Sequence, residues 1–271
     1  MIRDITLGQY YPAKSIIHQL DPRVKLVTTM VYIVSLFVAK GILGYVIATL
    51  FLAMVVKLSK VPFRYITKGL KAIIMILLIT VVFNLFLVDG EVVLWRFGFL
   101  KITDKGVRTA VFMAIRLIYL IIGSSIMTLT TTPNDLTDGL EKLLGPLKKI
   151  HVPVHEIAMM MSIALRFIPI LLEETDKIMK AQIARGADFE TGNLIQKAKA
   201  MVPLLVPLFI SAFRRANDLA MAMEARCYHG GDGRTKMKPL HYESRDRMAY
   251  AAVWGYLLLV IAANYVQNLY A

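Results

Sequence analysis

Residues 155–186 read HEIAMMMSIALRFIPILLEETDKIMKAQIARG, and this stretch decides how the rest of the chain is interpreted. Its first half is apolar and its second half is charged, yet apolar side chains recur at helical spacing through both halves. Because Arg166 lies inside the apolar half, the stretch is not the clean run of about 20 apolar residues that crosses a bilayer. We therefore predict a long amphipathic helix that lies at or below a membrane face.

A second stretch, residues 199–227, has the same design and reads KAMVPLLVPLFISAFRRANDLAMAMEARC. Its apolar half contains Pro203 and Pro207 and continues directly into a charged half with Arg214 and Asp218. We predict a second amphipathic helix here, for the same reason. The simpler alternative, in which both stretches are ordinary membrane spans with charged ends, stays open.

The composition places these two helices in a membrane protein. Of the 271 residues 57% are hydrophobic, the mean hydropathy is +0.58, and 32 Lys and Arg face 19 Asp and Glu. A nucleic-acid-binding protein would share the basic charge but not the apolar content, whereas a membrane protein carries its basic residues on cytoplasmic segments. The one cysteine, Cys227, excludes an intrachain disulfide.

The remaining apolar segments predict the membrane spans. A break of two residues, Lys40 and Gly41, separates the first two segments, so we expect a tight hairpin or one tilted helix there. The predicted fold class is an all-α polytopic membrane protein with about five transmembrane helices and a cytoplasmic domain. The predicted spans are residues 24–39, 42–56, 72–88, 107–130 and 248–266.

Basic residues set the expected orientation in the plasma membrane. The loop between the second and third spans has five cations and no acid, which places it in the cytoplasm. The N-terminus is then inside, the C-terminus is outside, and the amphipathic helices are cytoplasmic. The predicted division is an N-terminal membrane domain of four helices at 1–132, a cytoplasmic domain at 133–247 and a last helix at 248–271. The five cations are Lys57, Lys60, Arg64, Lys68 and Lys71.

The sequence contains no recognisable catalytic motif. Glycine-rich phosphate loops, nucleophile elbows and metalloprotease signatures are all absent from it. His151 and His155 have the spacing of helical metal ligands, but Pro153 between them argues against a continuous helix. We expect no metal site and no catalytic residue. The acids at 135, 138 and 141 are explained by their place at the start of a helix.

Two polar side chains inside predicted spans are candidates for function, because buried polarity is costly in a bilayer. Arg116 lies within the fourth span and Asn84 within the third. No chain of intramembrane acids or polar residues accompanies them along a substrate path. We therefore favour a structural pairing for Arg116 over a role in a pore.

Both amphipathic stretches end on a small residue, an arginine and another small residue. These are Ala184-Arg185-Gly186 and Ala225-Arg226-Cys227. A cation at a helix C-terminus favours the helix dipole, and a glycine commonly follows the last turn, so capping alone could explain one such ending. The repetition suggests a second interpretation, in which each guanidinium projects into a socket on another protein.

Together these features resemble the transmembrane T component of energy-coupling factor transporters, the EcfT or CbiQ-like family. The residues that carry the resemblance are HQLDPRVKL at 18–26, TTTPNDLTDGLEKLLGPL at 130–147, ALRFIPILLEE at 164–174 and the two arginine motifs. The resemblance implies that the two long helices are coupling helices that cross in an X. It also implies a structural motif formed by Asp21, Pro22 and Arg23.

The resemblance further implies a non-catalytic, energy-coupling subunit of an ATP-driven importer of vitamins or micronutrients. Its implied partners are two ABC-type ATPases (A and A′) and one or more membrane-embedded substrate-binding S components; ATP and Mg²⁺ would bind to the ATPases, with no cofactor on this chain. The implied ATPase-docking residues are Ala184, Arg185, Gly186, Ala225, Arg226 and Cys227. Cys227 departs from the usual glycine, which puts the left-handed helix ending in doubt there and suggests that the following glycines at 230 and 231 end the helix.

An apolar, methionine-rich face of the coupling helices is the expected contact for the S component, since such surfaces repack easily against different partners. The alternative is that these are ordinary core residues. Two other function classes are alternatives: a stand-alone secondary transporter or channel, and a membrane-embedded enzyme. Neither the broken symmetric spans of the first nor the clustered acids, histidines and cysteines of the second are found. The face comprises Met159, Met160, Met161, Ile163, Leu204, Leu205, Leu208 and Phe209.

Overall fold

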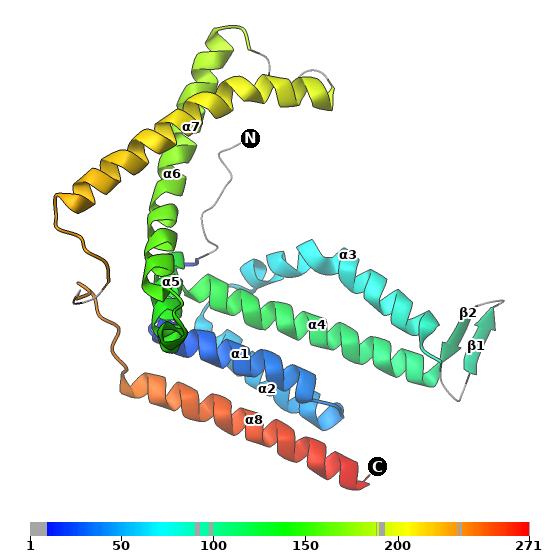
Figure 1. Ribbon diagram of the computed structural model, residues 1–271. Helices are drawn as coiled ribbons and strands as arrows, with labels where there is room; N and C mark the ends of the chain where they lie inside the picture. Colours follow the sequence, from blue (N-terminus) through cyan, green and yellow to red (C-terminus); the bar gives the residue numbers. More distant parts are fainter. Residues whose placement is uncertain are drawn as a thin grey trace. The chain divides into compact units, whose positions relative to one another are not determined.

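The computed structural model describes residues 10–89, 93–97, 100–187, 189, 193–231, 233 and 235–270, most of them helical (Figure 1). The chain divides into two compact units. We call Leu140–Pro239 the arm unit, and the part formed by Gly8–Gly139 together with Leu240 onward the bundle unit. The bundle unit contains α1 (Pro22–Val38), α2 (Ile42–Ser59), α3 (Phe63–Leu87), α4 (Asp104–Thr130) and α8 (Ser244–Tyr270). The arm unit contains η2 (Gly145–Ile150), α6 (Val154–Ala184) and α7 (Leu194–Glu224), and α5 (Pro133–Leu143) bridges the boundary in sequence.

The lengths and compositions of these helices confirm a multi-pass, all-α membrane protein. Four helices are long and apolar enough to cross a bilayer, and α3 adds a fifth if its two halves, which are bent by 59°, form one span. The four lie at Ile42–Ser59, Asp104–Thr130, Val154–Ala184 and Ser244–Gln267. The prediction had placed the third of these, α6, outside the membrane. Because α6 contains a segment apolar enough to cross a bilayer, it fits a span with a charged end as well as an amphipathic helix at the membrane face.

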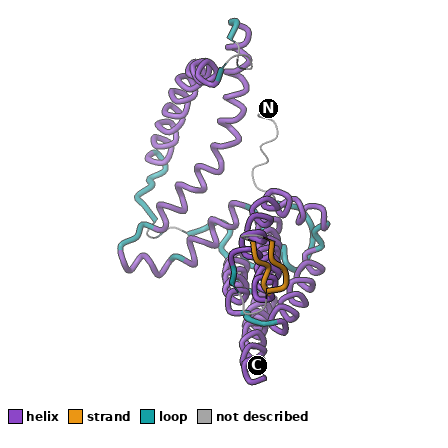
Figure 2. Tube along the Cα trace, turned by 90° about the vertical axis from the view of Figure 1, so that its right-hand side faces the viewer, coloured by secondary structure: helices purple, strands orange, loops and turns teal. Residues whose placement is uncertain are grey.

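Two local predictions in the bundle unit were wrong. The basic loop expected between the second and third spans is short, because α3 begins at Phe63 behind Pro62, whose fixed φ of −60° suits a helix start. An antiparallel pair of strands, β1 (Val93–Phe97) and β2 (Leu100–Thr103), joins α3 to α4 where no strand was expected (Figure 2). The run VLWRF at 93–97 contains β-branched and aromatic residues, which favour strands.

The tight turn between α1 and α2 is the predicted hairpin, and it is held from the far end of the chain. The side chain of Asn264 on α8 accepts from the backbone N–H of Lys40 at 3.1 Å and donates to the carbonyl of Val38 at 2.7 Å. Gly41 begins α2 where any Cβ would collide with the Gln267 side chain. Both sides of the turn therefore depend on α8.

Three aromatic rings pack together at the core of the bundle unit. The rings of Phe51 and Tyr256 stack with centroids 4.2 Å apart, and Tyr32 packs beside both. The Tyr256 hydroxyl accepts from the Ser35 hydroxyl at 2.8 Å and the Tyr32 hydroxyl donates to the carbonyl of Tyr119 at 3.3 Å, so both polar tips have partners. Residues from α1, α2 and α8 therefore form one core, although α8 follows the arm unit in sequence.

The intramembrane arginine has a structural partner, as we favoured. Arg116 Nε donates to the Tyr45 hydroxyl at 3.0 Å, and the guanidinium lies 5.4 Å from the centre of the Phe37 ring. Asn84 donates to the Thr80 carbonyl one turn back in its own helix. Both side chains are thus paired within the bundle unit.

In the arm unit, two helices of 31 residues cross each other (Figure 1). Arg215 on α7 forms a salt bridge of 2.8 Å with Glu174 on α6. Gln182 on α6 donates to the carbonyl of Pro203 on α7 at 3.5 Å. These contacts join the C-terminal half of α6 to the middle of α7, and the crossing implied by the family resemblance is present within this unit.

Candidate functional site

The end of α6 has a defined backbone geometry. The N–H of Ala187 donates to the carbonyl of Gln182 at 3.0 Å, and the N–H of Gly186 donates to the carbonyl of Ile183 at 2.9 Å. Gly186 adopts a left-handed conformation with φ of +86°. This pair of bonds and this conformation define a Schellman motif, in which Arg185 is the C-cap residue.

The end of α7 repeats that geometry bond for bond. The N–H of Tyr228 donates to the carbonyl of Met223 at 3.1 Å, and the N–H of Cys227 donates to the carbonyl of Glu224 at 2.8 Å. Cys227 has φ of +55°, so the left-handed ending is present without a glycine. The expectation that the helix would continue toward the glycines at 230 and 231 was wrong, since α7 ends at Glu224.

Both arginines occupy the same place in this motif and both are exposed. Among the described residues, the guanidinium groups of Arg185 and Arg226 have no hydrogen-bond or salt-bridge partner. Their neighbours Ala184 and Ala225 are exposed as well, and nothing lies within 4 Å of the position that a Cβ on Gly186 would take. Each helix therefore ends in an open, five-donor fork suited to carboxylates or backbone carbonyls of another protein.

The methionine-rich face predicted for the S component divides into three groups. The exposed group can meet a partner directly, and Phe209 in it packs against Phe213 with ring centroids 4.9 Å apart. Leu204 is buried, with an exposed fraction of 7%, so its side chain belongs to the core of the arm unit and not to a surface. Met159, Ile163 and Leu208 are partly buried. The exposed group comprises Met160, Met161, Leu205 and Phe209.

A cavity of 600 Å³ lies between the start of α6 and the end of α7. Met159 and Ile163 line it from α6, while Leu219, Met223 and Arg226 line it from α7. The second arginine motif therefore has apolar side chains of α6 beside it. This places two of the predicted S-component residues next to a predicted ATPase-docking residue.

The segment that follows the second arginine motif contacts α5 and the start of α6. Lys236 Nζ donates to Glu141 at 2.6 Å, and His155 Nδ1 donates to the other carboxylate oxygen at 2.9 Å. Burial raises the pKa of Glu141, but these two bonds outweigh burial and hold the pKa below its usual value. Gly231 packs on the His155 ring so closely that a Cβ would collide with it. We call Glu141, His155, Gly231 and Lys236 the strap.

As Pro153 indicated, no continuous helix joins the two histidines, whereas the interpretation of Glu141 as an acid at the start of a helix was wrong. His155 lies in the first turn of α6 and pairs with the Glu141 carboxylate of α5. His151 precedes α6 and has φ of +61°. The described residues contain no group of three or more side chains suited to hold a metal ion. Glu141 belongs to the strap. Thr132 caps α5, because its hydroxyl accepts from the backbone N–H of Asp135 at 3.2 Å and donates to the Asp135 carboxylate at 2.6 Å.

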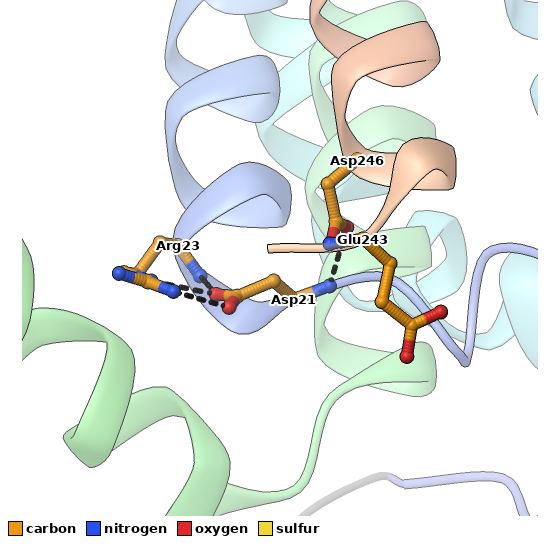
Figure 3. Close-up of polar contacts among 4 residues, drawn as sticks. All are labelled: Asp21, Arg23, Glu243 and Asp246. Carbon is orange, nitrogen blue, oxygen red and sulfur yellow. Dashed lines mark hydrogen bonds and ion pairs between the residues drawn. The ribbon is translucent and has the colours of Figure 1, made fainter. Parts of the chain in front are cut away.

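The Asp-Pro-Arg motif caps α1 in the bundle unit (Figure 3). Asp21 accepts from the backbone N–H of Arg23 at 2.8 Å, and the Arg23 guanidinium returns to the same carboxylate with contacts of 3.0 and 2.7 Å. Pro22 occupies the first turn, where its missing N–H has no intrahelical partner to lose. The Arg23 guanidinium also stacks on Tyr242, 3.8 Å from the ring centre.

Asp246 is a functional neighbour that sequence reasoning missed. One of its carboxylate oxygens accepts from the backbone N–H of Asp21 at 2.9 Å, and the other accepts from the N–H of Glu243 at 2.8 Å (Figure 3). Its exposed fraction is 2%. A single buried carboxylate thus caps α8 and joins it to the start of α1. The signal in the sequence was an acid two residues into a helix, which is common at helix starts and does not identify a distant partner.

The first residue of the HQLDPRVKL motif is also structural. His18 Nε2 donates to the carbonyl of Tyr11 at 2.9 Å, and Nδ1 accepts from the Ser15 hydroxyl at 2.7 Å. Burial lowers the pKa of His18, against the opposing effect of the bond to Tyr11. A neutral imidazole therefore fixes the segment that leads into the Asp-Pro-Arg cap.

Comparison with known proteins gives a consistent result. The chain matches the model of the CbiQ family, described as cobalt transport protein, over residues 13–237. It is 60% identical over 250 residues to the energy-coupling factor transporter transmembrane protein EcfT of Clostridium kluyveri, covering 92% of this chain and 93% of that protein. It is 52% identical to EcfT of Ruminiclostridium cellulolyticum, covering 98% and 99% of the two chains. It is 47% identical to EcfT of Bacillus subtilis, covering 97% of each chain.

Proposed function

Because the chain belongs to the CbiQ family, as an EcfT-type transmembrane component of an energy-coupling factor transporter, we propose that it transmits the motion of two partner ATPases through its two arginine-ended helices. The observation that carries this proposal is the repeated helix ending. Two helices present an exposed arginine at the same position of the same backbone motif. Two matching ends suit two matching sockets, one on each ATPase.

The geometry of the ends supports transmission of force as well as binding. In each Schellman motif the arginine lies between the last helical turn and a left-handed residue. Backbone hydrogen bonds on both sides therefore fix the position of its Cα, from which the side chain extends. When the ATPases approach or separate, the two ends would follow, and the crossing of α6 and α7 would convert that motion into a change of their relative angle. The salt bridge between Glu174 and Arg215 lies near this crossing.

The exposed apolar side chains on the two helices are the proposed contact for an S component. Met160 and Met161 on α6 and Leu205 and Phe209 on α7 are exposed. The S component would bind the cargo, a vitamin or another micronutrient, and ATP with Mg²⁺ would bind to the ATPases. This chain would then have no cofactor, and its N-terminus and arm unit would face the cytoplasm.

The test is co-purification of the two ATPases and an S component with wild type, Arg185→Ala, Arg226→Ala and the double variant. ATP hydrolysis and uptake of the labelled vitamin bound by that S component are measured in proteoliposomes. Each arginine should contribute about ten-fold to ATPase retention, the usual effect of losing hydrogen bonds from a charged group. The double variant should keep its bundle folded and lose coupled uptake.

The matched control removes the same charge elsewhere on the same helices. Arg166 on α6 and Arg214 on α7 are exposed and lie away from the two ends. The double variant Arg166→Ala with Arg214→Ala should retain the ATPases and transport as wild type does. If it loses them as severely as the arginine-end double variant, general charge attraction explains docking and the specific sockets do not exist.

A further inference from the structure

The bundle unit contains a second cavity, of 280 Å³, to which the transport proposal assigns no role. It lies between the segment before α1 and helices α1, α2, α4 and α8. Most of its wall is hydrocarbon from side chains such as Ile17, Phe51, Leu52, Ile126 and Val253. An engineered cavity of about 150 Å³ with such a lining stays dry and binds benzene, so this larger one suits a flexible apolar chain.

The cavity opens toward an exposed apolar surface of the bundle unit. Met54, Leu58 and Met248 line it and are also exposed on the outside of the bundle unit, with exposed fractions of 46%, 40% and 64%. No water is available to fill an apolar groove within the hydrocarbon layer. An acyl chain that entered from the side would place hydrocarbon against the apolar side chains that line the groove.

One end of the cavity carries a buried cation. Lys25 lines the cavity and has an exposed fraction of 6%. Its ammonium donates to the carbonyls of His18 at 3.0 Å and Thr130 at 2.8 Å, two neutral partners for a group with three N–H donors. Within the described part of the chain, no carboxylate lies at salt-bridge distance from it. One N–H donor of this ammonium therefore has no acceptor among the described residues, and an anion is the strongest acceptor for it.

A second cation lies at the same cavity. Arg245 lines it, is paired with the exposed carboxylate of Glu243, and contacts the side chain of Gln19, next to His18 in the chain. The carboxylates near Lys25 are engaged elsewhere: Asp21 with Arg23, Asp246 with two backbone N–H groups, and Asp135 with Thr132. No carboxylate lines the cavity itself.

We propose that this cavity binds one anionic phospholipid, with an acyl chain between α1, α2, α4 and α8 and the phosphate beside Lys25 and Arg245. A helix of a partner subunit could cover the apolar opening, but it would leave the Lys25 ammonium without an anion. A lipid satisfies both parts of the site at once. Basic pockets between transmembrane helices commonly bind acidic lipid headgroups in this way.

Native mass spectrometry of the delipidated full-length chain tests the proposal. The probes are dioleoyl phosphatidylglycerol, dioleoyl phosphatidylcholine and inorganic phosphate. Wild type should retain one phosphatidylglycerol at about ten-fold lower lipid concentration than phosphatidylcholine, as expected for charge-assisted hydrogen bonds. Arg245→Gln should remove most of that preference, and Lys25→Met should remove it fully.

Two further variants keep the test decisive if the Lys25 variant fails to fold. Ala252→Phe fills the cavity without touching its polar end and should abolish retention of either lipid. Arg247→Gln removes an exposed cation of α8 that does not line the cavity, and it should bind as wild type does.

Three results would overturn the lipid site. These are equal retention of the two lipids by wild type, unchanged retention in Ala252→Phe, and full displacement of the lipid by inorganic phosphate. If Ala252→Phe keeps the lipid but loses the S component on co-purification, the groove is an interface for a partner helix. None of these results bears on the arginine ends, because their test uses different variants.

Discussion

The ends of α6 and α7 are the same structure built from different residues. Each has the paired i→i−5 and i→i−3 backbone bonds, an arginine at the C-cap and a left-handed residue after it. The left-handed residue is Gly186 in one and Cys227 in the other, although a side chain in that conformation costs about 1–2 kcal/mol. The arginine geometry is therefore what the two ends share, and the residue that ends the helix can vary.

The second end also has a support that the first lacks within the described part of the chain. The strap of Glu141, His155, Gly231 and Lys236 fastens the segment after Cys227 to α5 and α6. This support offsets part of the strain at Cys227. Four predictions test this comparison.

The largest effect is expected from the arginines themselves. Arg185→Ala and Arg226→Ala should each lower the ratio of coupled uptake to ATP hydrolysis by about ten-fold, and by similar factors, because the two ends have the same geometry. The measurement is uptake and hydrolysis in the same proteoliposomes. A large effect of one variant with none of the other would show that the two ends are not equivalent.

The second effect concerns the glycine. Gly186→Val places a β-branched residue at φ of +86° and should destabilise the end of α6 by about 1–2 kcal/mol or more. Uptake should fall even though Arg185 is intact, while the melting temperature of the bundle unit stays unchanged. Gly186→Asn, a residue that accepts this conformation, is the control and should restore most of the uptake.

The third effect concerns the strap and is pH-dependent. Since the pKa of Glu141 is lowered in the folded chain, its bonds stabilise the fold above the unfolded pKa of about 4.3. This contribution is lost as the pH falls through the folded pKa. Glu141→Gln should lower the free energy of unfolding at pH 7 by about 1 kcal/mol. It should also reduce the loss of stability that occurs as the pH falls.

Thermal unfolding in detergent between pH 7 and pH 3 measures this effect. The control is Glu156→Gln, an exposed acid in the first turn of α6 that makes no strap contact. Its acid dependence should match that of wild type. An identical acid dependence in Glu141→Gln would mean that the strap does not stabilise the arm unit.

The smallest effect is expected from the cysteine. Cys227→Gly removes the strain at φ of +55° and should stabilise the end of α7 by about 0.5–1 kcal/mol, less the entropy that glycine adds to the unfolded chain. Retention of the ATPase should be unchanged or slightly tighter. Weaker retention would show that the Cys227 side chain itself contacts the partner.

The helices and the arginine ends could be predicted from the sequence because both depend on local patterns. Apolar runs separated by charge located α2, α4 and α8, and small residues after an arginine marked the two C-terminal ends. The strands were missed because runs of five and four residues are a weak signal beside apolar spans of about twenty.

The long-range contacts could not be predicted. Asp246 reaches Asp21 across 225 positions, and nothing in the local sequence distinguishes it from an acid that merely favours a helix dipole. The buried state of Leu204 and the partners of Glu141 likewise depend on how elements pack after the chain has folded. Sequence patterns specify which face of a helix is apolar, but not which neighbour covers it.

The bond between Asp21 and Asp246 has a consequence for how the protein is made. The N–H that caps the entry to α1 receives its acceptor only when residue 246 has been synthesised, and the turn after α1 awaits Asn264 in the same way. The start of α1 and the turn that follows it can therefore take their final hydrogen bonds only after the whole arm unit has been synthesised.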